Sequence, residues 1–154
     1  MSAIQDFEIR VPEKEIDLLR AKIALTRWPD EINDKRWSLG TGLSFLQDLV
    51  SYWSTEYDWR RAEQALNEAG SFKFKTSTGL NLHFLHSKSP DPNAIPLIMA
   101  HGWPDSVQEF LKIIPLLKQG IDRQAFHVVC PSMPGYGFSD KPTEHGMKSE
   151  AIKK

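Results

Sequence analysis

The sequence predicts an α/β fold in which a helical N-terminal region precedes a sheet that contains a parallel βαβ unit. Apolar residues recur at helical spacing as far as Gly70, and from Phe72 onward they alternate or form short runs, which is typical of strands. Between residues 95 and 139 the order strand, loop, helix, strand, loop is typical of a right-handed βαβ unit. A chain of 154 residues is long enough to bury a core.

The composition is that of a globular protein, with 40% hydrophobic and 25% charged residues. The formal net charge of −1 gives no electrostatic reason to expect nucleic acid or an anionic membrane as a partner. Cys130 is the only cysteine, so an intrachain disulfide is excluded, and its apolar surroundings predict a buried, unreactive thiol. The start lacks a signal-peptide pattern, and no apolar run approaches the roughly 20 residues that span a bilayer. A soluble, cytoplasmic protein is therefore expected.

Two helices are predicted in the first 57 residues. Pro12 and Glu13 favour the start of the first helix, and Trp28-Pro29 is expected to end it. The second helix has the most regular apolar spacing, i, i+3, i+4, i+7 and i+11 from Leu46 to Tyr57. The residues expected to face inward are Ile16, Leu19 and Ile23 in the first helix and Leu46, Leu49, Val50, Trp53 and Tyr57 in the second.

A third helix is predicted from Arg60 to Ala69, with Asp58 as its N-cap and Gly70 as its terminator. Its inward residues are expected to be Ala62, Ala65 and Leu66. No strand is predicted before Gly70. We interpret the aromatic side chains of this region as packing residues, and a ligand cage is the alternative: Trp28, Trp37, Tyr52, Trp53, Tyr57 and Trp59.

A β-hairpin is predicted next, because the apolar period changes from helical spacing to alternation. Phe72 and Phe74 alternate with lysines, Thr78-Gly79 forms the turn, and the partner strand runs from Leu82 to His86. Three residues separate His83 from His86, and on a strand this spacing directs the two side chains to opposite faces. A metal site built on this pair is therefore not expected.

The βαβ unit begins with an apolar strand from Leu97 to Ala100, which is expected to be buried. Ser106 and the Glu109 three residues later form a capping-box pattern for the following helix. Its apolar side comprises Phe110, Ile113, Ile114 and Leu117, and Pro115 is expected to kink or shorten it. The next strand is predicted over residues 125–130 and the next loop over residues 131–139. Residues 147–154 are expected to begin another helix.

The chemistry is expected at His101-Gly102-Trp103-Pro104, between the strand and the helix, where α/β enzymes place their active sites. Gly102 permits a tight turn, and Pro104 is a candidate for a cis peptide bond. The Trp103 N–H can then point into a cavity as an oxyanion-hole donor does, and its indole can form a wall. Two roles are open to His101, a general base or a residue that holds the loop by hydrogen bonds, and its strand-to-loop position favours the second.

Other catalytic motifs are missing from the sequence. There is no G-x-G-x-x-G or Walker A pattern for nucleotide phosphates. There is also no G-x-S-x-G nucleophile elbow. Ser139 lies in Gly-Phe-Ser-Asp-Lys, which lacks the flanking glycines, so it is not expected to be a nucleophile. No metal and no cofactor are predicted.

His101-Gly102-Trp103-Pro104, followed by Pro131-Ser-Met-Pro-Gly-Tyr-Gly-Phe-Ser139, resembles the first part of epoxide hydrolases of the microsomal type, in the α/β-hydrolase superfamily. The resemblance covers about residues 5 to 146 and includes Arg27-Trp28-Pro29, Tyr52-Trp53, Tyr57-Asp58-Trp59-Arg60 and Leu82-His83-Phe84. It implies an epoxide-hydrolase N-terminal region over residues 3–110, which wraps the catalytic domain in this family. It also implies the start of an incomplete α/β-hydrolase core over residues 95–154.

The resemblance implies a reaction in which an epoxide and water give a vicinal diol. In the family, an aspartate opens the epoxide and forms an ester, and a histidine oriented by an acidic residue activates water to hydrolyse it. Two tyrosines polarise the epoxide oxygen. None of these groups can be assigned in this chain, so the implied site is limited to oxyanion-hole or pocket residues: Trp103, His101, Gly102 and Pro104. The resemblance further implies a small epoxide substrate, a role in detoxification or aromatic-hydrocarbon catabolism, and a chain that is inactive alone.

Two other interpretations stay open. The chain could be a non-catalytic interaction module, or one half of a split enzyme. It would then pair with a missing partner segment, or with itself, through the exposed edge of the strand at residues 97–100. The other interpretation is a different member of the superfamily, such as a dehalogenase or an esterase, which the helical region before Gly70 disfavours.

Overall fold

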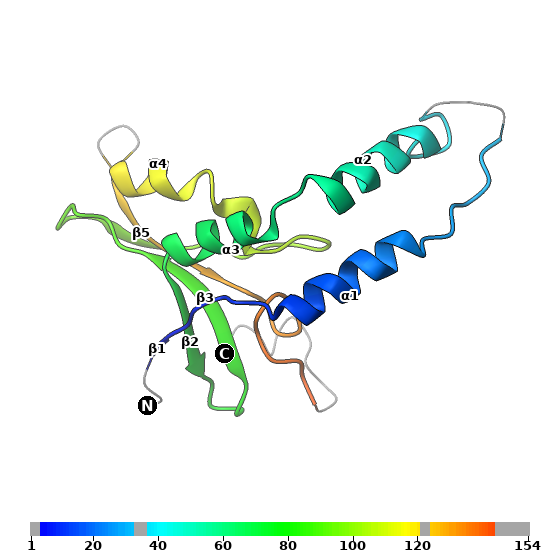
Figure 1. The fold of residues 1–154 in the computed structure, drawn as a ribbon. Coiled ribbons are helices and arrows are strands. Elements are labelled where there is room, and N and C mark those ends of the chain that lie inside the picture. Colours follow the sequence, from blue (N-terminus) through cyan, green and yellow to red (C-terminus); the bar gives the residue numbers. More distant parts are fainter. Residues whose placement is uncertain (1–3, 33–36, 121–123, 144–154) are drawn as a thin grey trace. The chain divides into compact units, whose positions relative to one another are not determined.

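The computed structural model describes residues 4–32, 37–120 and 124–143. The helix predicted over residues 147–154 lies outside the described residues. The chain forms two compact units, which we name the sheet unit (residues 1–9 and 62–154) and the helical unit (residues 10–61). Figure 1 shows their elements in chain order.

The sheet unit contains a five-stranded sheet in the order β1-β2-β3-β5-β4. Its strands are β1 (Gln5–Asp6), β2 (Ser71–Lys75), β3 (Asn81–Ser87), β4 (Ile95–Ile98) and β5 (Phe126–Pro131). Neighbours are antiparallel except for β4 and β5, which are parallel. The predicted hairpin and the predicted parallel strand pair are both confirmed. The expectation that no strand precedes Gly70 is wrong, because β1 pairs with β2. A strand of two residues has no periodicity that a sequence could reveal.

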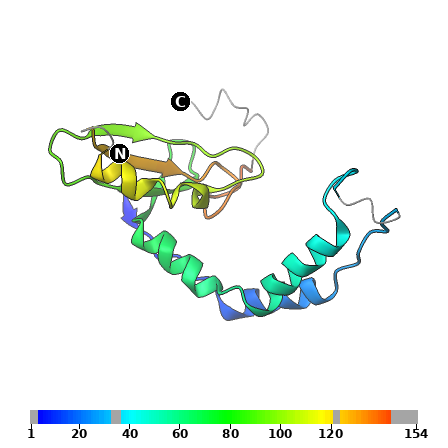
Figure 2. The ribbon, with the colours of Figure 1, turned by 90° about the horizontal axis from the view of Figure 1, so that it is seen from above.

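One face of the sheet packs against helices and contains the core (Figure 2). On this face Leu85 of β3 lies opposite Cys130 of β5, and Ser87 lies opposite Val128. The buried cluster comprises Ile9, Leu66, Leu85, Val107, Ile114, Leu117, Val128 and Cys130. The prediction that Cys130 is buried is confirmed.

Two short helices connect β4 to β5, the 3₁₀ helix η1 (Val107–Phe110) and the α-helix α4 (Ile114–Gln119). The single helix expected here is therefore divided, because Pro115 is accommodated only in a first helical turn. The 3₁₀ turn also changes the helical phase, since it has 3.0 residues per turn. As a result Ile114 and Leu117 are buried as expected, whereas Ile113 is exposed.

The helix α3 (Trp59–Glu68) begins as predicted, because the Asp58 carboxylate accepts hydrogen bonds from the Arg60 and Arg61 N–H groups. It ends before Gly70, whose φ of 85° favours glycine. Leu66 is buried as expected, but Ala65 is exposed. Glu63 is buried instead, a position that apolar spacing could not predict.

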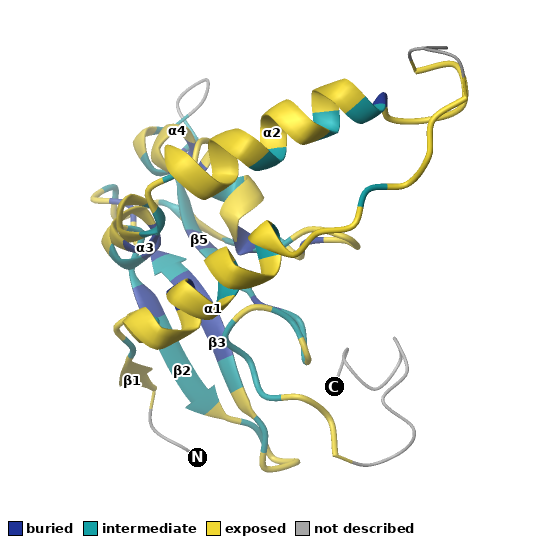
Figure 3. Cartoon of the chain, turned by 45° about the vertical axis from the view of Figure 1, so that its right-hand side comes forward, coloured by how far each residue is buried: buried dark blue, intermediate teal, exposed yellow. Residues whose placement is uncertain are grey.

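The helical unit contains α1 (Glu13–Ala24) and α2 (Leu43–Thr55), which pack against each other (Figures 1 and 2). Both helices were predicted, but α1 ends before Trp28 and α2 ends before Tyr57. The face formed by Ile16, Leu19 and Ile23 is the less exposed one, as expected. In α2 no residue is buried, and Figure 3 shows that most of this helix is exposed.

The strand β4 was expected to be buried, but Ile98 is 71% exposed and Ile95 is also exposed. The reason is its position, because β4 is the edge strand of the described sheet. This position agrees with the expectation of an exposed edge. Over residues 4–32, 37–120 and 124–143, no helix combines the length and the apolar character needed to cross a membrane.

Candidate oxyanion loop

The His101-Gly102-Trp103-Pro104 loop begins three residues after the last residue of β4. The Met99 N–H donates to Val129 O of β5 at 2.9 Å, so the sheet pairing extends almost to the loop. The Trp103-Pro104 peptide bond is cis, as expected from the sequence. The turn closes where the Asp105 N–H donates to Gly102 O at 3.2 Å. Ser106 then caps η1, since its hydroxyl accepts from the Gln108 N–H.

His101 is buried and both of its ring nitrogens are hydrogen-bonded. Nε2 accepts from the Met133 N–H at 3.1 Å. Nε2 is therefore unprotonated, and the proton lies on Nδ1, which donates to Gly102 O at 3.0 Å. Of the two roles considered for His101, these bonds favour holding the loop, because a base needs a free nitrogen directed at substrate.

The Gly102 carbonyl and the Trp103 N–H belong to the same planar peptide group. The bond from His101 to Gly102 O therefore also fixes the direction of the Trp103 N–H, on the opposite side of that group. Among the described residues, none accepts a hydrogen bond from the Trp103 N–H. The Trp103 side chain is 82% exposed, so the indole does not line an enclosed cavity in this structure.

A second loop, residues 132–140, follows β5 and lies beside His101. The Tyr136 ring contacts the His101 imidazole edge to face, with ring centroids 5.1 Å apart. The Ser139 hydroxyl donates to Ser132 O at 2.7 Å and accepts from the His83 N–H at 2.9 Å. These bonds agree with the expectation that Ser139 is not a nucleophile, since its hydroxyl holds the backbone.

The structure adds one group that the sequence did not predict, His83 with Ser132. The two side chains come from β3 and from the second loop, and Nδ1 of His83 lies 2.7 Å from Ser132 Oγ. Neither side chain is accessible, so the pair cannot attack a substrate. No signal in the sequence could have found it, because the two residues are 49 positions apart and meet only through the pairing of β3 with β5. Burial also raises the pKa of the Cys130 thiol to about 12, which agrees with an unreactive cysteine.

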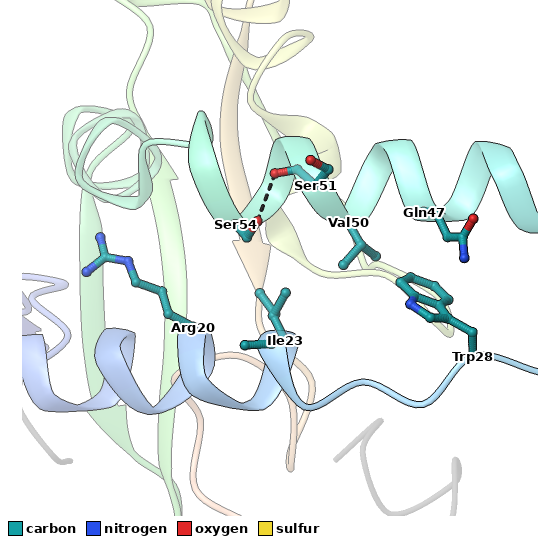
Figure 4. A pocket seen from close by; sticks show the side chains of 8 residues that line it. Arg20, Ile23, Trp28, Gln47, Val50, Ser51 and Ser54 are labelled. Atoms are coloured by element: carbon teal, nitrogen blue, oxygen red, sulfur yellow. Dashed lines mark hydrogen bonds between the residues drawn. The ribbon is translucent and has the colours of Figure 1, made fainter.

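Two grooves of the helical unit each include one of the aromatic residues considered for a ligand cage. A groove of about 360 Å³ lies between α1 and α2, and Figure 4 shows Ile23 and Trp28 facing Val50 across it. A second groove, of about 210 Å³, includes Trp37. Each groove thus contains one of the six aromatic residues. The Trp37 ring lies at a tilt to the Phe45 ring, with centroids 5.0 Å apart, but Trp37, Tyr52 and Trp53 are all exposed, so the packing interpretation stays a prediction.

Comparison with known proteins finds matches over nearly the whole chain. The model of the family described as "Epoxide hydrolase N terminus" matches residues 4–110, and that of the "alpha/beta hydrolase fold" matches residues 95–154. A protein of Stigmatella aurantiaca described as "Putative epoxide hydrolase" is 47% identical over 98% of this chain and 35% of its own length. "Epoxide hydrolase 1" of Sus scrofa is 39% identical over 97% of this chain and 35% of its own length.

Solved structures show the same relationship. The juvenile hormone epoxide hydrolase of the silkworm Bombyx mori matches with a TM-score of 0.86 and 30% identity, over 99% of this chain and 41% of that one. The Aspergillus niger epoxide hydrolase matches with a TM-score of 0.80 and 29% identity, over 94% and 38%. The chain spans about a third of the length of the curated relatives it matches. It belongs to the epoxide hydrolase family, and it corresponds to the N-terminal region of those enzymes.

Proposed function

We propose that this chain supplies the oxyanion side of an epoxide hydrolase active site. The observation behind the proposal is the Trp103 N–H, which is unpaired among the described residues and is directed by the bond from His101 to Gly102 O. The family reaction passes through an aspartyl ester, and water attack on that ester places negative charge on its carbonyl oxygen. A fixed N–H donor stabilises such an oxyanion, with an effect of about 3 kcal/mol per donor. Trp103, Gly102, His101 and Pro104 are the proposed pocket residues.

The aspartate, the histidine with its acid, and the tyrosines of the family reaction cannot be assigned in these 154 residues. We therefore expect no diol from styrene oxide with the purified chain alone, since an oxyanion donor has nothing to stabilise without a nucleophile. Turnover by a protein of verified mass would overturn this expectation. The coding sequence past Lys154 is the simplest check, because an in-frame Gly-Gly-Asp-Trp-like elbow would supply the nucleophile.

A chimera tests the role of Trp103. Residues 1–154 are joined to the downstream part of the Stigmatella aurantiaca relative, which is 47% identical in the matched region. Trp103→Pro removes the N–H, whereas the matched control Trp103→Phe keeps the N–H and removes only the indole. We expect Trp103→Pro to lower kcat about 10²- to 10³-fold, with a much smaller change for Trp103→Phe. A folded Trp103→Pro chimera with unchanged kcat would refute the proposal.

The finer properties that follow from the resemblance remain proposals. They are residues 3–110 as the N-terminal region, residues 95–154 as the start of the core, a small epoxide substrate, and a role in detoxification or aromatic-hydrocarbon catabolism. A cytoplasmic location is a separate proposal. The exposed edge of β4 supports one more proposal, self-association of the isolated chain. Sedimentation of wild type and Ile98→Lys tests it: we expect the lysine to reduce association, and a sharp wild-type monomer with cooperative unfolding would argue against it.

A further inference from the structure

The imidazole of His83 is fully buried in β3 and bridges two serine hydroxyls. Nε2 lies 2.9 Å from Ser71 Oγ of β2, and Nδ1 lies 2.7 Å from Ser132 Oγ of the second loop. The rings of Phe7 and Phe138 contact the imidazole edge to face, at centroid distances of 5.7 and 5.4 Å. Both ring nitrogens are thus satisfied in a buried position, which makes this a fixed and specific connection.

The backbone of His83 holds the same loop. Its carbonyl accepts from the Ser132 N–H at 2.9 Å, and its N–H donates to Ser139 Oγ at 2.9 Å. Ser139 Oγ in turn donates to Ser132 O. Gly137 allows this close approach, because a Cβ there would lie 3.0 Å from Ser132 Oγ, and its φ of 51° also favours glycine. The position of Ser132 is therefore determined by side-chain and backbone bonds to His83 and by the bond from Ser139.

The next residue after Ser132 reaches the oxyanion loop. The Met133 N–H donates to His101 Nε2, which leaves the proton on Nδ1 for the bond to Gly102 O. That bond orients the peptide group that contains the Trp103 N–H. A path of hydrogen bonds and two peptide groups, Ser132–Met133 and Gly102–Trp103, thus joins β2 and β3 to the proposed donor.

We propose that His83 is a positioning residue for the oxyanion donor: with Ser71 and Ser132 it fixes the second loop, and Met133 in that loop sets the tautomer and orientation of His101. The proposal rests on the proposed function of the Trp103 N–H. His83 itself touches no substrate, since it is fully buried. A residue 20 positions before Trp103 thereby acts on the geometry of the site.

The first test uses the ¹⁵N-labelled chain and needs no activity. Ser132→Ala removes the hydroxyl that bonds to His83 and leaves the backbone unchanged. We expect the ¹⁵N shifts of His101 to change from a protonated Nδ1 toward a tautomer mixture, and the Met133 amide to exchange at least tenfold faster. Ser89→Ala is the matched control, because it removes a similarly buried hydroxyl that bonds to Lys118 O, and it should leave both signals unchanged. Unchanged His101 and Met133 signals in Ser132→Ala would overturn the proposal.

The second test measures the same variants in the chimera. We expect Ser132→Ala to lower kcat about tenfold with little change in KM, and Ser89→Ala to leave both unchanged. One outcome is that the His101 signals move in Ser132→Ala and that Trp103→Pro lowers kcat. If Ser132→Ala then leaves kcat unchanged, the positioning proposal is wrong. If Trp103→Pro has no effect while the His101 signals still move, the proposed function fails instead, so the two failures are distinguishable.

Discussion

The sheet unit and the helical unit bury different shares of their apolar side chains. All eight residues of the core cluster belong to the sheet unit. Among the described residues of the helical unit, Ile16 is the one buried apolar side chain, whereas the exposed ones include Leu18, Leu25, Phe45, Leu49, Tyr52 and Trp53. Figure 3 shows this contrast between the mostly exposed α2 and the more buried strands β3 and β5.

The difference shows that a regular apolar period predicts a helix or strand, but does not predict how deeply its apolar face is buried. The apolar period of α2 predicted a helix correctly, but an amphipathic helix gains most of its stability from what its apolar face packs against. Within the helical unit that face has few partners. We therefore expect the sheet unit to contribute most of the free energy of unfolding, and the predictions below test this comparison.

The largest expected difference is between two Leu→Ala substitutions. Leu85→Ala removes a fully buried side chain from the sheet core and should lower the free energy of unfolding by about 2–5 kcal/mol. Leu49→Ala removes the same atoms from α2, where the side chain is 49% exposed, and should cost less than about 1 kcal/mol. Urea denaturation followed by circular dichroism measures both. Equal losses would contradict the comparison.

The second prediction concerns pH and His83. Burial, with a smaller contribution from the Lys73 ammonium, lowers the pKa of His83 from 6.5 to about 4. Between these values the unfolded chain binds the proton and the folded chain does not, so stability falls as pH falls from 6.5 toward 4. The full loss is about 3 kcal/mol, and the contribution is complete above pH 6.5.

Denaturation at pH 6.5 and pH 5 checks this prediction. His83→Phe should flatten the decline, whereas the control His86→Phe should retain most of it, because His86 is only partly buried. The helical unit contains no histidine, so its own response in this range should be smaller. A decline that is identical in wild type and His83→Phe would refute the assignment.

Periodicity and turn residues were sufficient for most of the fold, because each acts locally. They predicted α1, α2, α3, the hairpin, and the parallel strands β4 and β5. They missed β1, whose two residues form a strand only because the edge of β2 is available. They also predicted a single helix where the structure has two, η1 and α4. The sequence shows that Pro115 disturbs a helix, but it does not show at which residue the next helix begins.

The candidate site divides in the same way. The local motif around Trp103 made Pro104 a candidate for a cis peptide bond, which the structure contains, and it favoured a hydrogen-bonded His101 over a general base. The bonds to Gly102 O and from the Met133 N–H agree with this preference. The connection from His83 to Ser132 was not predictable, because it joins residues 49 positions apart that meet only when β3 pairs with β5. No spacing rule relates such residues in a single sequence.

A smaller effect is expected at the N-cap of α3. Asp58→Ala removes the carboxylate that accepts from the Arg60 and Arg61 N–H groups, and it should cost about 1 kcal/mol. Asp48→Ala, in the middle of α2, removes the same charge without removing a cap and should not destabilise the chain, because alanine favours helices. Thermal unfolding followed at 222 nm compares the two. A larger loss for Asp48→Ala would contradict the cap.

The smallest effect is expected at the ion pair within the helical unit. Glu13 Oε2 lies 2.6 Å from Arg60 Nη2, and Arg20 is a second partner at 3.3 Å. The hydrogen bond from Arg60 is the main cause that lowers the pKa of Glu13, so any stability it adds is present above the ordinary pKa and is lost as pH falls through the lowered one. Because the pair is open to solvent, salt should screen it. Arg60→Gln should return the Glu13 titration, followed by NMR, toward its ordinary value, whereas the control Arg61→Gln should not. An unmoved titration in Arg60→Gln would show that even this contact in the helical unit is not maintained in solution.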